Sequence, residues 1–116
     1  MRDRQENWES ALVAELRAAN GRPYDVRRWN CARFAHQCAT AIATRPIPWI
    51  TRGGLVEGAN AALTRIDPTG AQRGDVVLAH VPHPSLGICL GVRAAFVTAS
   101  GLMTIPRSDI VAAWSV

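Results

Sequence analysis

The sequence predicts an α+β fold, with helices in the first part of the chain and an antiparallel sheet in the second. Between about residues 7 and 66, apolar residues recur every three or four positions, which is the period of an amphipathic helix. From residue 74 the apolar period changes to two, and turn residues follow at short intervals, as in neighbouring antiparallel strands. This order predicts that residues 1–116 form a single domain, in which N-terminal helices pack on a C-terminal β-meander or small open barrel.

The first predicted helix follows a capping residue, either Asn7 or Ser10. Its apolar positions recur at helical spacing: Trp8, Leu12, Leu16 and Ala19. We expect the helix to end at Asn20-Gly21, because glycine adopts the left-handed conformation that closes many helices. Pro23 then prevents the helix from continuing.

The second predicted helix has the most regular pattern in the chain. It opens after the capping residue Asn30 and runs to about Thr44, shortly before two prolines. One face is apolar throughout: Cys31, Phe34, Ala35, Cys38, Ala39 and Ile42. A shorter third helix is predicted over residues 53–66, GGLVEGANAALTRI, and residues 67–70 then form a turn.

The sequence predicts five strands after the change of period. They span Val76–His80, Leu86–Val92, Ala94–Ala99, Leu102–Ile105 and Ala112–Val116. In the second strand, Leu86 and Ile88 point to one face, whereas Gly87 and Cys89 point to the other. Glycine lets another segment approach the backbone closely, so we expect the alanine- and cysteine-rich second helix to pack on the glycine face. This packing would bring Cys31 toward the strand.

The composition excludes several classes of function. All thirteen basic residues are arginines, and they are scattered along the chain, whereas nucleic-acid binding favours a clustered basic stripe with stacking aromatics. No segment has the roughly 20 apolar residues that cross a bilayer, and the first residues are too polar for a signal peptide. Three cysteines are an odd number, which argues against a disulfide framework, and their spacing with the histidines matches no common zinc site. We therefore predict no nucleic acid, no membrane insertion, no metal and no cofactor.

Cys31 is either a small core residue of the second helix or a thiol positioned to react. The N–H groups at the start of a helix stabilise a thiolate and can also donate to a developing oxyanion. Cysteine hydrolysis also needs a histidine that takes and returns a proton. His83, between two prolines, and His80 are the candidates, and for each the alternative is an exposed histidine without a role. Cys38 and Cys89 are interpreted as core residues.

The order of three motifs resembles the NlpC-type branch of the papain-like superfamily. These are W-x-C-x-x-F at a helix start (Trp29–Phe34), R-G-D-V-V (Arg73–Val77) and L-G-I-x-L-G (Leu86–Gly91). The chain is most similar to small phage and prophage proteins of that superfamily, from about Pro23 to the final A-W-x-V (Ala113–Val116). The resemblance implies a cysteine at a helix N-terminus, packed on an antiparallel sheet.

Position by position, the resemblance gives Cys31 the place of the nucleophile. The family's catalytic histidine immediately precedes the L-G-I stretch, where this chain has Ser85, and its third polar residue corresponds to Thr98. A serine hydroxyl cannot act as a general base near neutral pH. The resemblance therefore implies the papain-like fold without an intact peptidase centre, and His83, two residues before Ser85, is the remaining candidate base.

We therefore expect a phage or prophage tail-tip or tail-assembly component with a degenerate cysteine-peptidase domain. Its partners would be other tail proteins or further copies of this chain. Trp49, in a proline-rich loop, is a candidate contact unless it is buried over the core. The protein would be made in the host cytoplasm and then built into the virion tail. The alternative is an active cysteine amidase or endopeptidase that cleaves peptidoglycan, with Cys31 as nucleophile and His83 or His80 as base.

Overall fold

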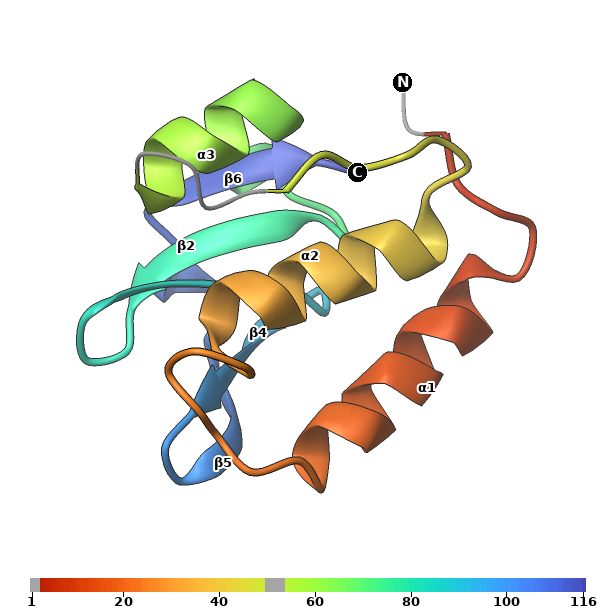
Figure 1. Cartoon of the computed structure of the whole chain (residues 1–116). Coiled ribbons are helices and arrows are strands. Elements are labelled where there is room, and N and C mark those ends of the chain that lie inside the picture. The colour runs from red at the N-terminus through yellow and green to blue at the C-terminus, as the bar shows by residue number, and fades with distance from the viewer. Residues whose placement is uncertain (1–2, 50–53) are drawn as a thin grey trace.

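The computed structural model describes residues 3–49 and 54–116, and within them three α-helices are followed by six strands (Figure 1). The helices are α1 (Trp8–Asn20), α2 (Cys31–Ile42) and α3 (Leu55–Ala62). The strands are β1 (Thr64–Ile66), β2 (Val76–His80), β3 (Pro84–Cys89), β4 (Arg93–Thr98), β5 (Gly101–Pro106) and β6 (Ala112–Ser115). The predicted α+β class is confirmed. No helix in the described part of the chain is long and apolar enough to span a bilayer.

The six strands form one antiparallel sheet in the order β1-β6-β2-β3-β4-β5. Strands β2 to β5 are a meander, because each pairs with the next along the chain. Strand β6 returns to pair between β1 and β2. Strands β1 and β5 are the two edges and do not pair with each other within the described residues, so the sheet does not close into a barrel.

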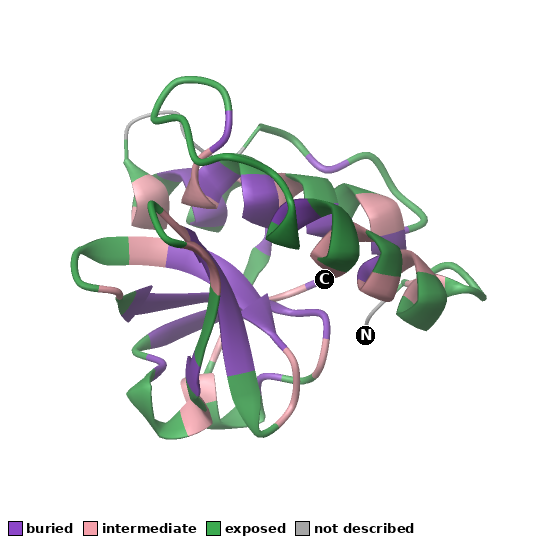
Figure 2. Cartoon of the chain, turned by 90° about the horizontal axis from the view of Figure 1, so that it is seen from below, coloured by how far each residue is buried: buried purple, intermediate pink, exposed green. Residues whose placement is uncertain are grey.

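Helix α2 lies across one face of the sheet, and α1 packs along the outer side of α2 (Figure 1). The buried face of α2 includes Phe34, Ala35 and Cys38, which share one apolar cluster with Leu86 and Ile88 of β3. Figure 2 shows this burial as a continuous purple band on the strands beneath the helices. The main core of the protein is therefore the layer between α2 and the sheet.

The prediction that α2 packs on the face of Gly87 and Cys89 is wrong. That face holds a second apolar cluster, which includes Cys89 and Phe96 and to which both edge strands contribute, through Ile66 and Ile105. The sheet therefore curves around this cluster. A Cβ atom on Gly87 would lie 2.6 Å from two carbons of the Phe96 ring, so the glycine makes room for a neighbouring strand's side chain and not for a helix.

The end of α2 is set by the N-terminal segment. The helix ends at Ile42, two residues before the predicted Thr44, because residues 3–5 pair with the chain that leaves it. The Gln5 N–H donates to the Ile42 oxygen at 2.9 Å, and the Thr44 N–H donates to the Asp3 oxygen at 3.1 Å. These hydrogen bonds join segments that are far apart in the sequence, so the sequence around Thr44 contains no local signal for the end of the helix.

Helix α1 ends at Asn20, as predicted, but without the left-handed cap. Gly21 has a φ of −96°, and the turn is closed by a hydrogen bond of 3.2 Å from the Arg22 N–H to the Ala19 oxygen. The Asn7 side chain makes no capping hydrogen bond, and the Ser10 hydroxyl donates to the Asn7 oxygen at 3.0 Å.

The third predicted helix is too long. Helix α3 covers only Leu55–Ala62, and the predicted start at Gly53 lies outside the described residues. Residues Thr64–Ile66 form strand β1, which pairs with β6 from Thr64↔Ser115 to Ile66↔Ala113. Leucine and isoleucine at helical spacing fit either structure in so short a segment, and the pairing with β6 decides between them.

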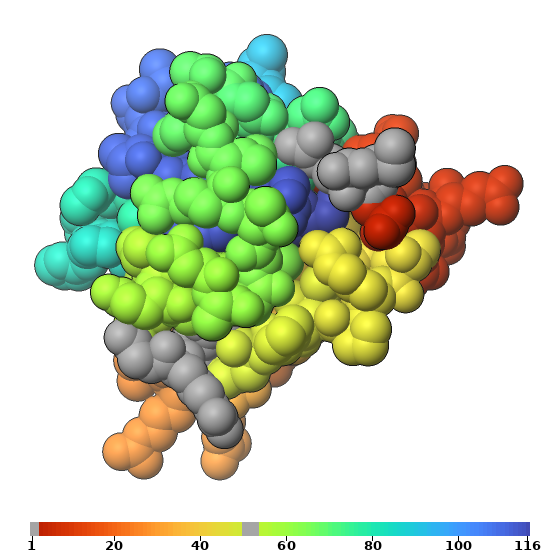
Figure 3. Space-filling view, turned by 90° about the horizontal axis from the view of Figure 1, so that it is seen from above, coloured from red at the N-terminus to blue at the C-terminus, as the bar shows by residue number. Residues whose placement is uncertain are grey.

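A buried ion pair joins the two ends of the chain. Arg4 Nη2 donates to Asp75 Oδ1 at 2.8 Å, and both side chains are almost fully buried. Arg4 Nε also donates to the Val116 oxygen at 3.0 Å, while the Val116 N–H donates to Asp75 at 3.1 Å. Figure 3 shows one face of the molecule, on which α3 (green) and residues 43–49 (yellow) lie beside the blue C-terminal part of the chain.

Candidate functional site

The N-terminus of α2 is fixed by two short-range caps. The Asn30 side-chain oxygen accepts a hydrogen bond of 3.0 Å from the Arg33 N–H, which confirms the predicted cap. The Asn30 amide also donates to the Val26 oxygen at 2.8 Å. In the preceding turn, the Asp25 carboxylate accepts from the N–H groups of residues 27 and 28. Cys31 is therefore the first residue of a well-anchored helix.

Cys31 is half-buried and lines a pocket of about 280 Å³ at one end of the sheet. The walls come from the α1–α2 connection, the β2–β3 turn, the start of β3 and the end of β4. They consist of Tyr24, Cys31, Val81, Pro82, His83, Pro84, Ser85, Val97, Thr98 and Ala99. The antiparallel pairing of β3 with β4, through Ile88↔Ala95, brings the start of one strand to the end of the other.

Four of the residues singled out from the sequence line this one pocket. Cys31 comes from α2, His83 from the β2–β3 turn, Ser85 from β3 and Thr98 from β4. From the sequence, these residues were expected to lie together only because of the resemblance. The structure brings them into one pocket without using that resemblance. Their convergence makes this pocket the candidate functional site.

The Ser85 and Thr98 hydroxyl groups, which both line the pocket, are hydrogen-bonded to backbone groups. The Ser85 hydroxyl donates to the His83 oxygen at 3.0 Å. The Thr98 hydroxyl donates to the Gly101 oxygen at 2.9 Å and accepts from the Ser100 N–H at 3.1 Å. Thr98 thus closes the turn between β4 and β5. Neither hydroxyl is hydrogen-bonded to the Cys31 sulfur.

Within the described residues, no hydrogen bond joins His80 or His83 to the Cys31 thiol. His83 is exposed, and among the described residues neither of its ring nitrogens has a hydrogen-bond partner, Cys31 included. His80 is the last residue of β2 and lines a neighbouring pocket with Met103 and Ile105, to which Cys31 does not contribute. Of the two predicted bases, only His83 therefore shares a pocket with Cys31.

The other two cysteines lie in the two apolar cores, as predicted. Burial raises the pKa of the Cys38 thiol, and the nearby Glu15 carboxylate adds to the effect. Cys38 is therefore an inert core thiol. Cys89 lies on the opposite face of the sheet, where its sulfur is 3.6 Å from Arg107 Nη1 and 3.8 Å from the Gly91 oxygen.

Sequence reasoning missed Tyr24, which lines the pocket from the α1–α2 connection. Its side chain is 39% exposed, so its hydroxyl can reach a bound molecule. The connection lies between two helices and has no periodic pattern, so the only local signal was an aromatic residue in a polar loop.

Chemically, the site offers a thiol at a helix N-terminus, backbone N–H groups, the Tyr24 hydroxyl, one exposed imidazole, and the Ser85 and Thr98 hydroxyls that are engaged elsewhere. A thiol in this position can react with an electrophile. Turnover by hydrolysis also requires proton exchange with an acid–base group in contact with the sulfur, and no hydrogen bond of that kind joins the described residues around Cys31.

Residues 49–116 match the family described as a domain of unknown function, DUF6950, and this range is more than half of the chain. The chain belongs to this family. The DUF6950 match covers α3 and the whole sheet, and so includes His83, Ser85 and Thr98, whereas α2 and Cys31 lie before it. No curated protein matches the chain.

Proposed function

We propose that this DUF6950 protein is a papain-like domain of the NlpC type whose cysteine-peptidase centre is degenerate. The proposal is supported by a cysteine that begins a helix lying across an antiparallel sheet, and by the pocket that this cysteine shares with β3 and β4. The resemblance of the W-x-C-x-x-F, R-G-D-V-V and L-G-I-x-L-G motifs supports it from the sequence.

One observation carries the degenerate assignment. Ser85 and Thr98 occupy the positions that the resemblance gives to the catalytic histidine and its polar partner, and both line the Cys31 pocket. Their hydroxyls are held by backbone groups and cannot exchange protons with a thiol near neutral pH. On this proposal the pocket retains the thiol but has no acid–base group hydrogen-bonded to it within the described residues.

The biological role we propose is that of a tail-tip or tail-assembly component of a phage or prophage. Its partners are other tail proteins or further copies of the chain, and it moves from the host cytoplasm into the virion tail during assembly. The support is the similarity to small phage and prophage proteins over about Pro23 to Val116.

A second candidate is an active amidase or endopeptidase that cleaves peptidoglycan, and one observation favours it. His83 lines the same pocket as Cys31, and its imidazole, in the β2–β3 turn, has no hydrogen-bond partner among the described residues. Catalytic hydrogen bonds often tighten only when substrate binds, so a rotation of this side chain would supply the missing base.

The experiment that tests the proposal uses Cys31→Ala in the particle that encodes this chain and in the purified protein. We expect normal particles with normal infectivity, and no release of amino groups from purified peptidoglycan by either the wild-type or the variant protein. Cys38→Ala is a control for the loss of a thiol that lies in the core.

Two results would contradict the proposal. The first is peptidoglycan cleavage by the wild-type protein that is lost in both Cys31→Ala and His83→Gln, which would establish the amidase or endopeptidase. The second is the formation of normal Cys31→Ala particles that cannot infect, which would show that the thiol acts after assembly.

A further inference from the structure

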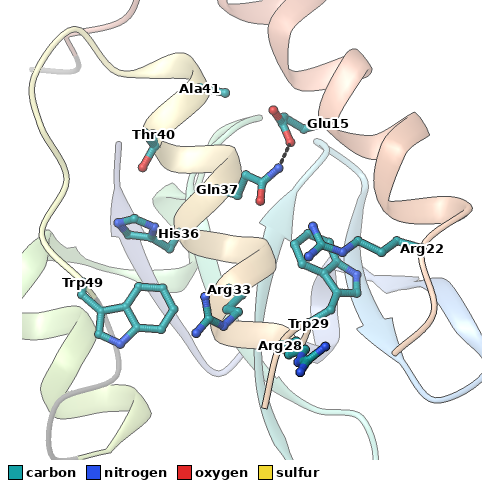
Figure 4. Close-up of a pocket in the computed structure, with 10 residues that line it drawn as sticks. All are labelled: Glu15, Arg22, Arg28, Trp29, Arg33, His36, Gln37, Thr40, Ala41 and Trp49. Carbon is teal, nitrogen blue, oxygen red and sulfur yellow. Dashed lines mark hydrogen bonds between the residues drawn. The ribbon is translucent and has the colours of Figure 1, made fainter. Parts of the chain in front are cut away.

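A second pocket, of about 360 Å³, lies on the outer side of α2 between α1 and residues 45–49 (Figure 4). It is lined by Glu15, Arg22, Arg28, Trp29, Arg33, His36, Gln37, Thr40, Ala41 and Trp49, and shares none of these with the Cys31 pocket. We call it the arginine pocket. In Figure 4, Trp49 and His36 lie at one end, Trp29 and Arg22 at the other, and Arg33 between them.

Two of the three arginines are stacked on tryptophan rings. The Arg22 Cζ atom lies 4.0 Å from the centroid of the Trp29 ring, and the Arg33 Cζ atom lies 5.1 Å from that of Trp49. A guanidinium group held over an indole face keeps its planar fork of N–H donors in a fixed orientation. The stacks therefore orient the donors before any ligand arrives.

The tryptophans themselves are held in place. The Trp29 ring is 3% exposed and packs edge-on against Phe34, with centroids 6.2 Å apart. The Trp49 ring packs edge-on against His36 at 5.0 Å, and His36 Nε2 lies 2.9 Å from the Ile47 oxygen. Trp49 thus covers α2 and is 39% exposed, instead of being buried in the core.

The arginine donors of this pocket are unused within the described residues, unlike those of Arg93 and Arg107. Within the described residues, the side chains of Arg22, Arg28 and Arg33 make no hydrogen bond or ion pair. By contrast, Arg107 donates four hydrogen bonds to neighbouring groups, and Arg93 donates to Thr104.

The acidic residue of the pocket does not neutralise these arginines. The Glu15 carboxylate accepts a hydrogen bond of 2.8 Å from the Gln37 amide, and no ion pair joins it to the described residues around it. Three guanidinium groups therefore face one carboxylate, and the pocket carries excess positive charge.

From this geometry we infer that the arginine pocket binds the carboxylate groups of an acidic polypeptide segment on a partner protein. A carboxylate matches the guanidinium fork with two parallel hydrogen bonds. Arg28 and Arg33 can each hold one side-chain carboxylate of the same segment. This inference does not depend on the proposed function, because it uses no residue of the Cys31 pocket.

Single-stranded nucleic acid fits the pocket less well. Proteins that bind it without sequence preference stack bases on free aromatic faces. Here Arg22 covers Trp29, which is otherwise buried, and Arg33 covers one face of Trp49. The rings orient arginines and leave little face for a base.

The test is fluorescence anisotropy with fluorescein-labelled hexaglutamate, with hexaglutamine as the uncharged probe. We expect saturable binding of hexaglutamate alone, and a loss of affinity of at least about tenfold in the double variant Arg28→Gln/Arg33→Gln. The single variant Arg33→Lys keeps the positive charge but loses the planar guanidinium group that stacks on Trp49. It should bind hexaglutamate about threefold more weakly than the wild-type protein.

The matched control is Arg17→Gln/Arg27→Gln, which removes two exposed charges outside the pocket and should change the affinity by less than about twofold. Circular dichroism checks that each variant is folded. The inference is overturned if hexaglutamate does not saturate by about 1 mM, or if the control pair loses as much affinity as the pocket pair. Tighter binding of oligothymidylate, lost in the pocket pair, would also overturn it and assign the site to nucleic acid.

Discussion

The Ser85 hydroxyl donates a hydrogen bond of 3.0 Å to the backbone oxygen of His83, at the edge of the pocket that Cys31 lines. Ser85 stands at the position that the resemblance gives to the catalytic histidine. It also ties the start of β3 to the turn before it. The Ser85 hydroxyl therefore has a structural role. The effect of substituting Ser85 should be measured on the stability of the protein as well as on the reactivity of Cys31.

Thr98 should likewise contribute to stability and not to chemistry. Thr98→Val removes the hydrogen bonds to Gly101 and Ser100 that close the β4–β5 turn, and should lower the free energy of unfolding by about 1–2 kcal/mol. Urea denaturation measures this change. Thr64→Val is the matched control, because the Thr64 side chain is exposed and makes no hydrogen bond within the described residues. Equal effects of the two substitutions would contradict the assigned role of Thr98.

Gly87 should not tolerate a side chain. Gly87→Ala would place a Cβ atom 2.6 Å from the Phe96 ring, in the core enclosed by the sheet, and should cost about 1–3 kcal/mol of stability. Gly21→Ala is the control, since a Cβ atom there meets nothing within 4 Å. Thermal unfolding of both variants checks the prediction, and an unchanged melting temperature for Gly87→Ala would refute the packing on this face.

The ion pair between Arg4 and Asp75 should be the costliest single contact to break. Asp75→Ala removes the buried carboxylate that accepts from the Arg4 guanidinium and from the Gln72 and Val116 N–H groups, and we expect a loss of about 3–5 kcal/mol in the free energy of unfolding. Asp109→Ala, on the surface, should change it by less than about 0.5 kcal/mol. If denaturant unfolding gave Asp75→Ala a similarly small effect, the buried pair would not be holding the two ends of the chain together.

The class and most of the elements of the fold could be predicted because their signals are local. The Asn30 cap and the six apolar positions after it define α2, and the change of period near Gly74 defines the sheet. Strand β2 has the predicted bounds, Val76–His80. Strand β1 and the end of α2 were missed, because each is decided by pairing with a distant segment.

The candidate site was only partly predictable. Resemblance placed Cys31, Ser85 and Thr98 in one constellation, but the face of β3 that meets α2 was predicted wrongly, because the small residues of β3 accommodate Phe96 instead of a helix. The arginine pocket was missed altogether. Its residues come from α1, the connection, α2 and the segment before α3, and scattered arginines in the sequence gave no sign that three of them gather.

The most direct test of the degenerate centre is the rate at which iodoacetamide alkylates Cys31 between about pH 6 and pH 9, followed by mass spectrometry. Cys38 and Cys89 are buried and serve as internal references. Because Cys31 is more exposed than either, a faster labelling rate at Cys31 does not by itself show that its thiol is activated. The pH profile decides. We predict no inflection below pH 7 in the wild-type protein, no change in His83→Gln, and a rate at neutral pH that is about tenfold higher in Ser85→His, where an imidazole is restored. A wild-type inflection below pH 7 that disappears in His83→Gln would contradict the account, since it would mean that His83 already exchanges a proton with the thiol.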